Sequence, residues 1–88
     1  MKPPKVKFKK LGKEPPTGKP GGTPFGTCNK ATGLITIDPR QSEDEMMDTI
    51  IHEALHSSYP FLEEEIVHKG GNAVSEILWK LGYRRVRQ

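Results

Sequence analysis

The sequence predicts an α+β domain, with a small antiparallel sheet of two or three strands packed on two helices. Two segments in the second half of the chain carry apolar residues at helical spacing. Short segments in the first half either alternate apolar and polar residues or are β-branched, which is typical of strands. At 88 residues the chain is too short to divide into two parts that each bury a core, so we expect a single domain over residues 1–88.

The first expected element is an edge strand near the N-terminus. Val6 and Phe8 alternate with lysines between Lys5 and Lys10, which gives the strand one solvated, charged face. The residues that follow, from about 12 to 24, are rich in Gly, Pro and Lys and have no periodicity. We therefore expect a mobile loop there, with no functional residue in it.

A hairpin is expected over residues 25–38. Residues 29–33 have the composition of a turn, and Leu34 to Ile37 form a β-branched strand. Asp38-Pro39 ends this strand, because proline cannot donate a ladder hydrogen bond.

The first helix is expected from Glu43 to Ser58, before Pro60. Ser42 and Glu45 have the spacing of a capping box, in which the Ser42 hydroxyl accepts from the Glu45 amide and Glu45 reaches back. Acidic residues in the first turn also suit the positive end of the helix dipole. One stripe of this helix is apolar and is expected to be core; its members are Met46, Met47, Ile50, Ile51, Ala54 and Leu55.

The second helix is expected from about Glu63 to Leu81, packed on the first. Gly70-Gly71 conflicts with this expectation, because a glycine inside a helix costs about 1 kcal/mol relative to alanine. A kink or a restart is therefore expected there, with Asn72 as the cap. Gly82 is a suitable C-terminal stop.

Charge and cysteine content restrict the class of protein. The net charge is +3, with basic ends around an acidic middle, but no aromatic residue lies among the C-terminal arginines, so nucleic-acid binding is not expected. Cys28 is the only cysteine, which excludes an internal disulfide and favours a reducing compartment. We see neither a signal peptide nor an apolar run of about 18 residues. A soluble, cytoplasmic monomer without a membrane partner is therefore expected.

The sequence His52-Glu53-Ala54-Leu55-His56 has the pattern H-E-x-x-H and lies inside the first expected helix. Residues four apart share one helix face, so both imidazoles can bind the same ion while Glu53 faces the attacking water. The histidines lie away from the middle of the apolar stripe, so this face can line a cleft. Imidazole and carboxylate ligands suit Zn²⁺.

A catalytic zinc site needs a third protein ligand, and four residues are candidates. Glu63, Glu64 and Glu65 open the second expected helix, and His68 is their rival. Helical angles alone favour Glu63, with Glu64 offset but within reach and Glu65 pointing away. The metzincin pattern is excluded, because Leu62 occupies the position of its third histidine.

Residues 34–85 resemble small metallopeptidases encoded in tailed-phage genomes, which look like minimal gluzincins. The resemblance lies in I-T-I-D-P-R, H-E-A-L-H, E-E-x-V and L-W-K-L-G-Y-R, and it covers about two thirds of the chain. It implies that Glu64 is the third metal ligand, that Glu63 caps the glutamate helix, and that the protein works in the host cytoplasm. The chain departs from this pattern at Gly70-Gly71 and in its long Gly/Pro loop.

Together these features predict a zinc metallopeptidase acting on a peptide or protein substrate. The expected metal ligands are His52, His56 and Glu64, and the expected general base is Glu53. We expect the strand over residues 34–37 to pair with an extended substrate at its edge. The alternative is a non-catalytic, zinc-stabilised binding module whose basic termini contact nucleic acid or an acidic partner; four protein ligands, including His68, would favour it.

Overall fold

The computed structural model describes residues 5–86 and contains three short strands and two helices. The strands are β1 (Val6–Phe8), β2 (Gly26–Cys28) and β3 (Ile35–Ile37), and the helices are α1 (Glu43–Ser58) and α2 (Glu64–Lys80). The predicted α+β class is confirmed. Over residues 5–86, neither helix combines the length and the apolar character needed to cross a membrane.

The sheet is mixed, whereas an antiparallel sheet was expected. Its strand order is β1-β3-β2, so β3 is central. β2 runs antiparallel to β3, with Thr27 opposite Thr36, but β1 runs parallel to β3, with Val6 opposite Ile35. The tight hairpin places β2 on one side of β3. The long segment between β1 and β2 lets β1 reach the other side in the same direction as β3, as parallel pairing requires a long connection.

The turn between β2 and β3 forms as its residue types predict. The Asn29 side-chain oxygen accepts from the amides of Ala31 and Thr32 at 3.0 and 3.2 Å. Gly33 has φ +77°, a left-handed conformation that glycine adopts without steric cost, and its amide donates to the Asn29 carbonyl at 2.7 Å. These bonds fix the register of the hairpin that leads into α1.

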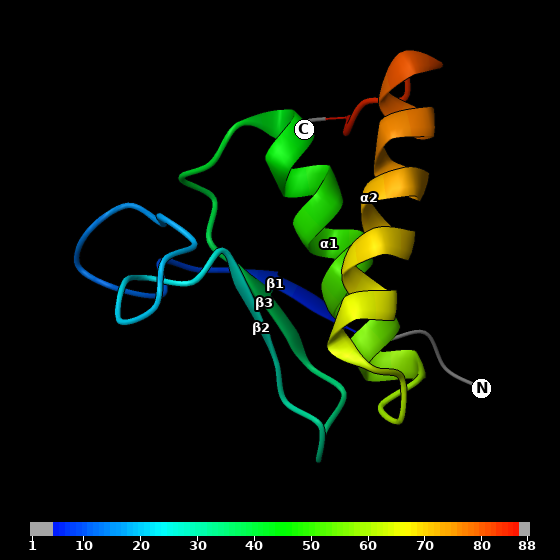
Figure 1. Ribbon diagram of the computed structural model, residues 1–88. Helices are drawn as coiled ribbons and strands as arrows, with labels where there is room; N and C mark the ends of the chain where they lie inside the picture. Colours follow the sequence, from blue (N-terminus) through cyan, green and yellow to red (C-terminus); the bar gives the residue numbers. More distant parts are fainter. Residues whose placement is uncertain (1–4, 87–88) are drawn as a thin grey trace.

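Helix α1 lies between the sheet and α2 (Figure 1). It contacts β2 and β3 on one side and α2 on the other, and α2 contacts no strand of the described chain. The expectation that the sheet packs on both helices therefore holds for α1 only. The core joins Ile35 and Ile37 of β3 to Met46 of α1, with Ile50 and Ala54 packed against them. Three members of the predicted apolar stripe, Met46, Ile50 and Ala54, thus face the sheet.

The N-terminus of α1 is at Ser42, as predicted, but its hydrogen bonds differ from a capping box. Ser42 has extended backbone angles and no side-chain bond to a backbone amide. Its hydroxyl donates to Glu45 Oε1 at 2.7 Å, and the Met46 amide donates to the Ser42 carbonyl at 2.8 Å. The Ser42 and Glu45 side chains therefore hydrogen-bond to each other, and neither of them caps the backbone amides of the first turn.

Helix α2 is continuous through Gly70-Gly71, so the expected kink is absent. Gly71 is buried against α1, and a Cβ atom there would lie 3.7 Å from the His52 Cα atom. The position has room for a methyl group and little more, which lets the helices approach closely. Gly70 faces open space.

A polar contact fixes how the two helices lie against each other. In the orientation that satisfies both ends of the Asn72 amide, Nδ2 donates to both carboxylate oxygens of Asp48 at 2.8 and 2.9 Å. Ser75 Oγ also donates to Asp48 Oδ1 at 3.2 Å. Asp48 lies one turn before His52 on α1, so these bonds fix α2 beside the H-E-x-x-H segment.

Candidate metal centre

Three side chains from the two helices converge at one point. His52 and His56 lie one turn apart on α1, and Glu64 is the first residue of α2. Glu64 Oε1 lies 2.9 Å from His52 Nε2, Glu64 Oε2 lies 2.8 Å from His56 Nε2, and the two Nε2 atoms are 3.1 Å apart. All the candidate ligand atoms lie within 4.8 Å of one another.

This geometry fits a metal ion. Two ligand atoms of a tetrahedral zinc site lie about 3.3 Å apart, close to the separations between the three side chains. Three protein ligands also leave one coordination position open, which is the arrangement of catalytic zinc sites and not of closed structural ones. The imidazole rings are half-buried, whereas the Glu64 side chain is 70% exposed, so the group is accessible from solvent. These residues could therefore hold a metal ion.

The other candidates for the third ligand lie outside this group. Glu63 is the N-cap of α2, with extended backbone angles, so a helical angle cannot be extrapolated to it. The Glu65 carboxylate pairs with Lys69 Nζ at 3.0 Å on the exposed side. The His68 ring centroid lies 6.2 Å from that of His52. Within residues 5–86, the one group suited to a metal consists of His52, His56 and Glu64.

Glu53 is buried beside the two histidines on α1. Burial raises the pKa of its carboxyl group, because the ionised form loses solvation. The nearby His52 and His56 rings act in the opposite direction and lower that pKa, and the Glu64 carboxylate raises it. Glu53 therefore lies close enough to all three side chains to interact with them electrostatically.

Close passage of β2 over α1 positions Glu53. A Cβ atom at Gly26 would lie 2.7 Å from Thr49 Cγ2 and 3.2 Å from Glu53 Cγ, so only glycine fits without displacing them. No role was expected for this glycine from the sequence. The sequence does carry a signal for it, because a glycine inside a strand pattern indicates that another part of the chain approaches the backbone closely.

The segment before β2 forms one wall of the cleft that contains the metal group. Gly18, Lys19 and Phe25 line it together with His52, Glu53, Glu64 and His68. No functional residue was expected in residues 12–24. The loop borders the candidate site, and the expectation that it holds no functional residue stays a prediction, as does its mobility.

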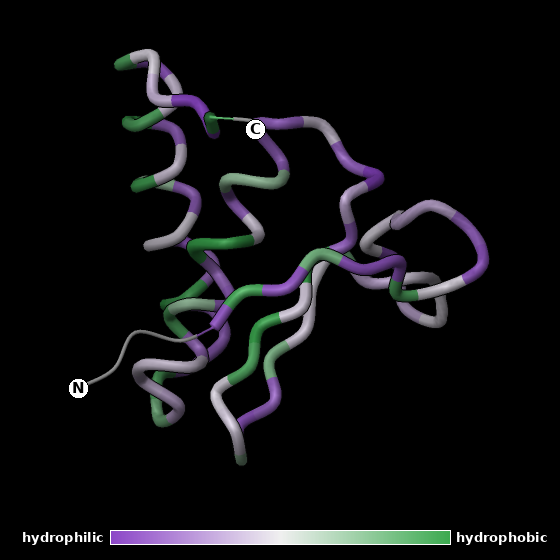
Figure 2. Tube along the Cα trace, turned by 180° about the vertical axis from the view of Figure 1, so that it is seen from behind, coloured by the Kyte–Doolittle hydropathy of each residue, from purple (hydrophilic) through white to green (hydrophobic). Residues whose placement is uncertain are grey.

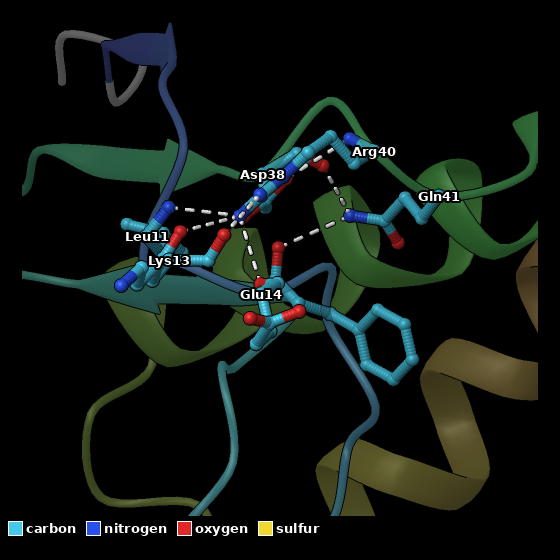
Figure 3. Close-up of polar contacts among 8 residues, drawn as sticks. Leu11, Lys13, Glu14, Asp38, Arg40 and Gln41 are labelled. Carbon is cyan, nitrogen blue, oxygen red and sulfur yellow. Dashed lines mark hydrogen bonds and ion pairs between the residues drawn. The ribbon is translucent and has the colours of Figure 1, made fainter.

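A buried ion pair anchors the start of this loop (Figure 3). Asp38, fully buried at the end of β3, accepts from Arg40 Nε at 3.0 Å, from Arg40 Nη2 at 2.9 Å and from the Leu11 amide at 2.9 Å. The Arg40 guanidinium also donates to the carbonyls of Gly12 and Glu14. The hydrogen bonds from Arg40 hold the pKa of the Asp38 carboxyl well below its usual range.

No protein-family model matches the sequence, and the comparisons with curated proteins and with solved structures gave no match either.

Proposed function

We propose that the protein is a zinc-dependent peptidase. One observation carries the proposal: two imidazoles and a carboxylate converge within ligand distance of one another, and a buried glutamate lies beside them in an open cleft. This combination is what metal-assisted hydrolysis requires. The resemblance to small phage metallopeptidases, and with it a place in the host cytoplasm, belongs to the same proposal and rests on the sequence.

Each residue has a distinct role in this proposal. His52, His56 and Glu64 would hold the ion, which supplies a Lewis acid that activates water and polarises the scissile carbonyl. Glu53 accepts the proton of the attacking water and returns it to the leaving amine nitrogen. Its burial beside His52 and His56 suits this role, because the carboxylate lies next to the proposed ion and is shielded from bulk water.

An extended polypeptide is the substrate that the cleft suits best. The expectation that residues 34–37 pair with substrate is wrong, because β3 is central and both its edges are occupied. β2 is an edge strand, and Gly26 lines the cleft. Phe25 and Asn29 direct backbone groups toward β3, so by alternation Gly26 and Cys28 direct theirs toward the free edge. A substrate strand could pair there, beside Glu53.

Replacing the proposed base tests the function. We expect Glu53→Gln to bind zinc and fold as the wild type does, but to hydrolyse peptides about 10²–10⁴-fold more slowly, the usual effect of removing a general base. Hydrolysis would be followed by mass spectrometry on a mixed peptide library with zinc-loaded protein. Loss of zinc in the variant would contradict the role of Glu53, and a wild type that binds zinc but cleaves no peptide would contradict the proposal.

The alternative, a non-catalytic zinc module, has less support. It was to be recognised by a closed site in which His68 completes four protein ligands, and His68 lies outside the metal group. Of the basic C-terminal residues, Arg84 stacks on Trp79 at 3.3 Å and Arg85 on Phe8 at 4.0 Å. These arginines therefore contact rings of the chain itself, and Arg87 lies outside the described residues.

A further inference from the structure

Helix α2 has apolar residues on two sides, and only one of them is covered. Val67 and Gly71 are buried on the side that faces α1. Ile66, Val74, Ile77 and Leu81 are 54%, 46%, 59% and 69% exposed. Figure 2 shows hydrophobic positions along the edge of α2 that is turned away from α1. We define the outer face of α2 as Ile66, Gly70, Ala73, Val74, Ile77 and Leu81.

The outer face is a continuous stripe. Ile66, Gly70, Ala73, Ile77 and Leu81 follow one another at spacings of three or four residues, as in the seam of a helix pair. Leu81 keeps helical backbone angles, so the stripe extends to the end of the helix. No charged residue interrupts it. Four large apolar side chains exposed together on one helix of a small protein indicate an interaction surface.

We propose that a second copy of the chain covers this face, with the two α2 helices antiparallel about a two-fold axis. Such a pairing places Gly70 of each chain opposite Ile77 of the other, twice. No atom lies within 4 Å of the Cβ position of Gly70, so the isoleucine can enter there. Ile66 then lies opposite Leu81, and Ala73 opposite Val74. Large residues thus meet small ones at the centre.

The charges beside the stripe favour the antiparallel arrangement. Glu65 and Lys69 form an ion pair at 3.0 Å, and Glu76 and Lys80 form another at 2.9 Å, all on one flank of the outer face. Antiparallel helices bring Glu65 toward Lys80 of the second copy and Lys69 toward Glu76. In a parallel two-fold pair the same flank of the two helices would lie on opposite sides of the seam, so these charges would not meet and the pairing would be lost.

The proposed dimer leaves the candidate metal centre open. Glu64 lies on the side of α2 that meets α1, so a partner on the outer face does not cover the cleft. The dimer is therefore independent of the proposed peptidase function, and either proposal can fail without the other. It replaces the expectation of a monomer.

Light scattering on the full chain tests the association. We expect a concentration-dependent mass approaching twice the 9.9 kDa of one chain, and a single-chain mass for Ile77→Glu at the same concentrations. Phe61→Glu is the matched control, because Phe61 is 79% exposed but lies between the helices and off the outer face. Circular dichroism checks that both variants fold. A wild type that stays monomeric at millimolar concentration, or a dimer that persists in Ile77→Glu, would overturn the proposal.

Disulfide trapping tests the direction of the helices. In a Cys28→Ser background, we expect an equimolar mixture of Ile66→Cys and Leu81→Cys chains to form cross-linked heterodimers under mild oxidation. Each variant alone should not, because in the antiparallel pair identical positions lie about 22 Å apart. Cross-linking of Ile66→Cys with itself would show a parallel pair and overturn the arrangement.

Discussion

Two carboxylates of this molecule, Asp38 and Glu64, have opposite surroundings. Asp38 is fully buried and receives hydrogen bonds from the Arg40 guanidinium and the Leu11 amide. Glu64 is largely exposed, and its two oxygens face two imidazole nitrogens. The chain itself supplies a full positive charge to the first carboxylate. It supplies only imidazole rings to the second, and the ligand atoms of all three groups lie close together.

The difference separates a structural carboxylate from a binding one. A buried carboxylate must have its counter-charge in the folded chain, because its desolvation is otherwise too unfavourable. An exposed carboxylate needs no counter-charge in the folded chain, because water solvates it, and it can bind a cation from solution. Mutation of Asp38 should therefore affect folding, and mutation of Glu64 should affect metal binding.

The largest expected effect is on folding. Asp38→Ala should lower the free energy of unfolding by about 3 kcal/mol, because it leaves the Arg40 guanidinium and the Leu11 amide without their acceptor. Urea denaturation of metal-free protein measures it. The structural role of Asp38 would be contradicted if the variant kept wild-type stability, or if it folded normally and lost zinc binding instead.

The same pair predicts an acid dependence. The lowered pKa of Asp38 means that the folded state favours its ionised form, so its contribution is complete above the ordinary pKa of 3.8 and is lost as pH falls further. Metal-free wild type should therefore lose stability below about pH 4, and Asp38→Asn should lack this part of the decline. Identical pH profiles for the two proteins would show that the pair does not stabilise the fold.

The second effect is on the metal. Glu64→Ala should weaken zinc binding more than 100-fold, equivalent to about 2.7 kcal/mol, because losing a direct ligand exceeds the 10–100-fold typical of outer contacts. Glu65→Ala is the matched control, since it removes an acid from the same helical turn. Isothermal titration calorimetry compares them, together with Glu63→Ala and His68→Ala. If His68→Ala releases zinc and Glu64→Ala does not, a three-histidine site replaces the proposed one.

The smallest effect is the stabilisation by the metal itself. At a free zinc concentration ten times its Kd, the folded chain should gain about 1.4 kcal/mol, because the three ligands meet only in the folded state. Thermal unfolding with zinc and with chelator shows this as a shift in Tm. Glu64→Ala should show a much smaller shift at the same concentration; an equal shift would indicate binding elsewhere.

Local signals explain what the sequence predicted well. The bounds of α1, the turn at Asn29 and the shared face of His52 and His56 depend on residues at most five positions apart. Their spacing fixes their geometry once the local structure forms. The direction of β1 and the bond from the Leu11 amide to Asp38 depend on segments 27 to 29 residues apart, whose pairing is a property of packing.

The third member of the metal group, Glu64, does not follow from helix geometry alone. Helical angles favoured Glu63, but α2 begins at Glu64, and a shift of one residue at a helix end changes which side chain turns inward. The two glycines were also misread as a break. Gly71 meets the backbone of His52 from the neighbouring helix, which no pattern within α2 could reveal.

Among the helices and strands of residues 5–86, α2 contacts α1 alone, and this has a consequence for how the molecule opens. The sheet and α1 protect each other, whereas α2 can detach by losing the single set of contacts it makes with α1. Its amide hydrogens should exchange with solvent through such partial openings, while those of α1 and β3 wait for global unfolding. An ion held by His52, His56 and Glu64 would link α1 to α2. The amide exchange rates of the two helices should then become more similar.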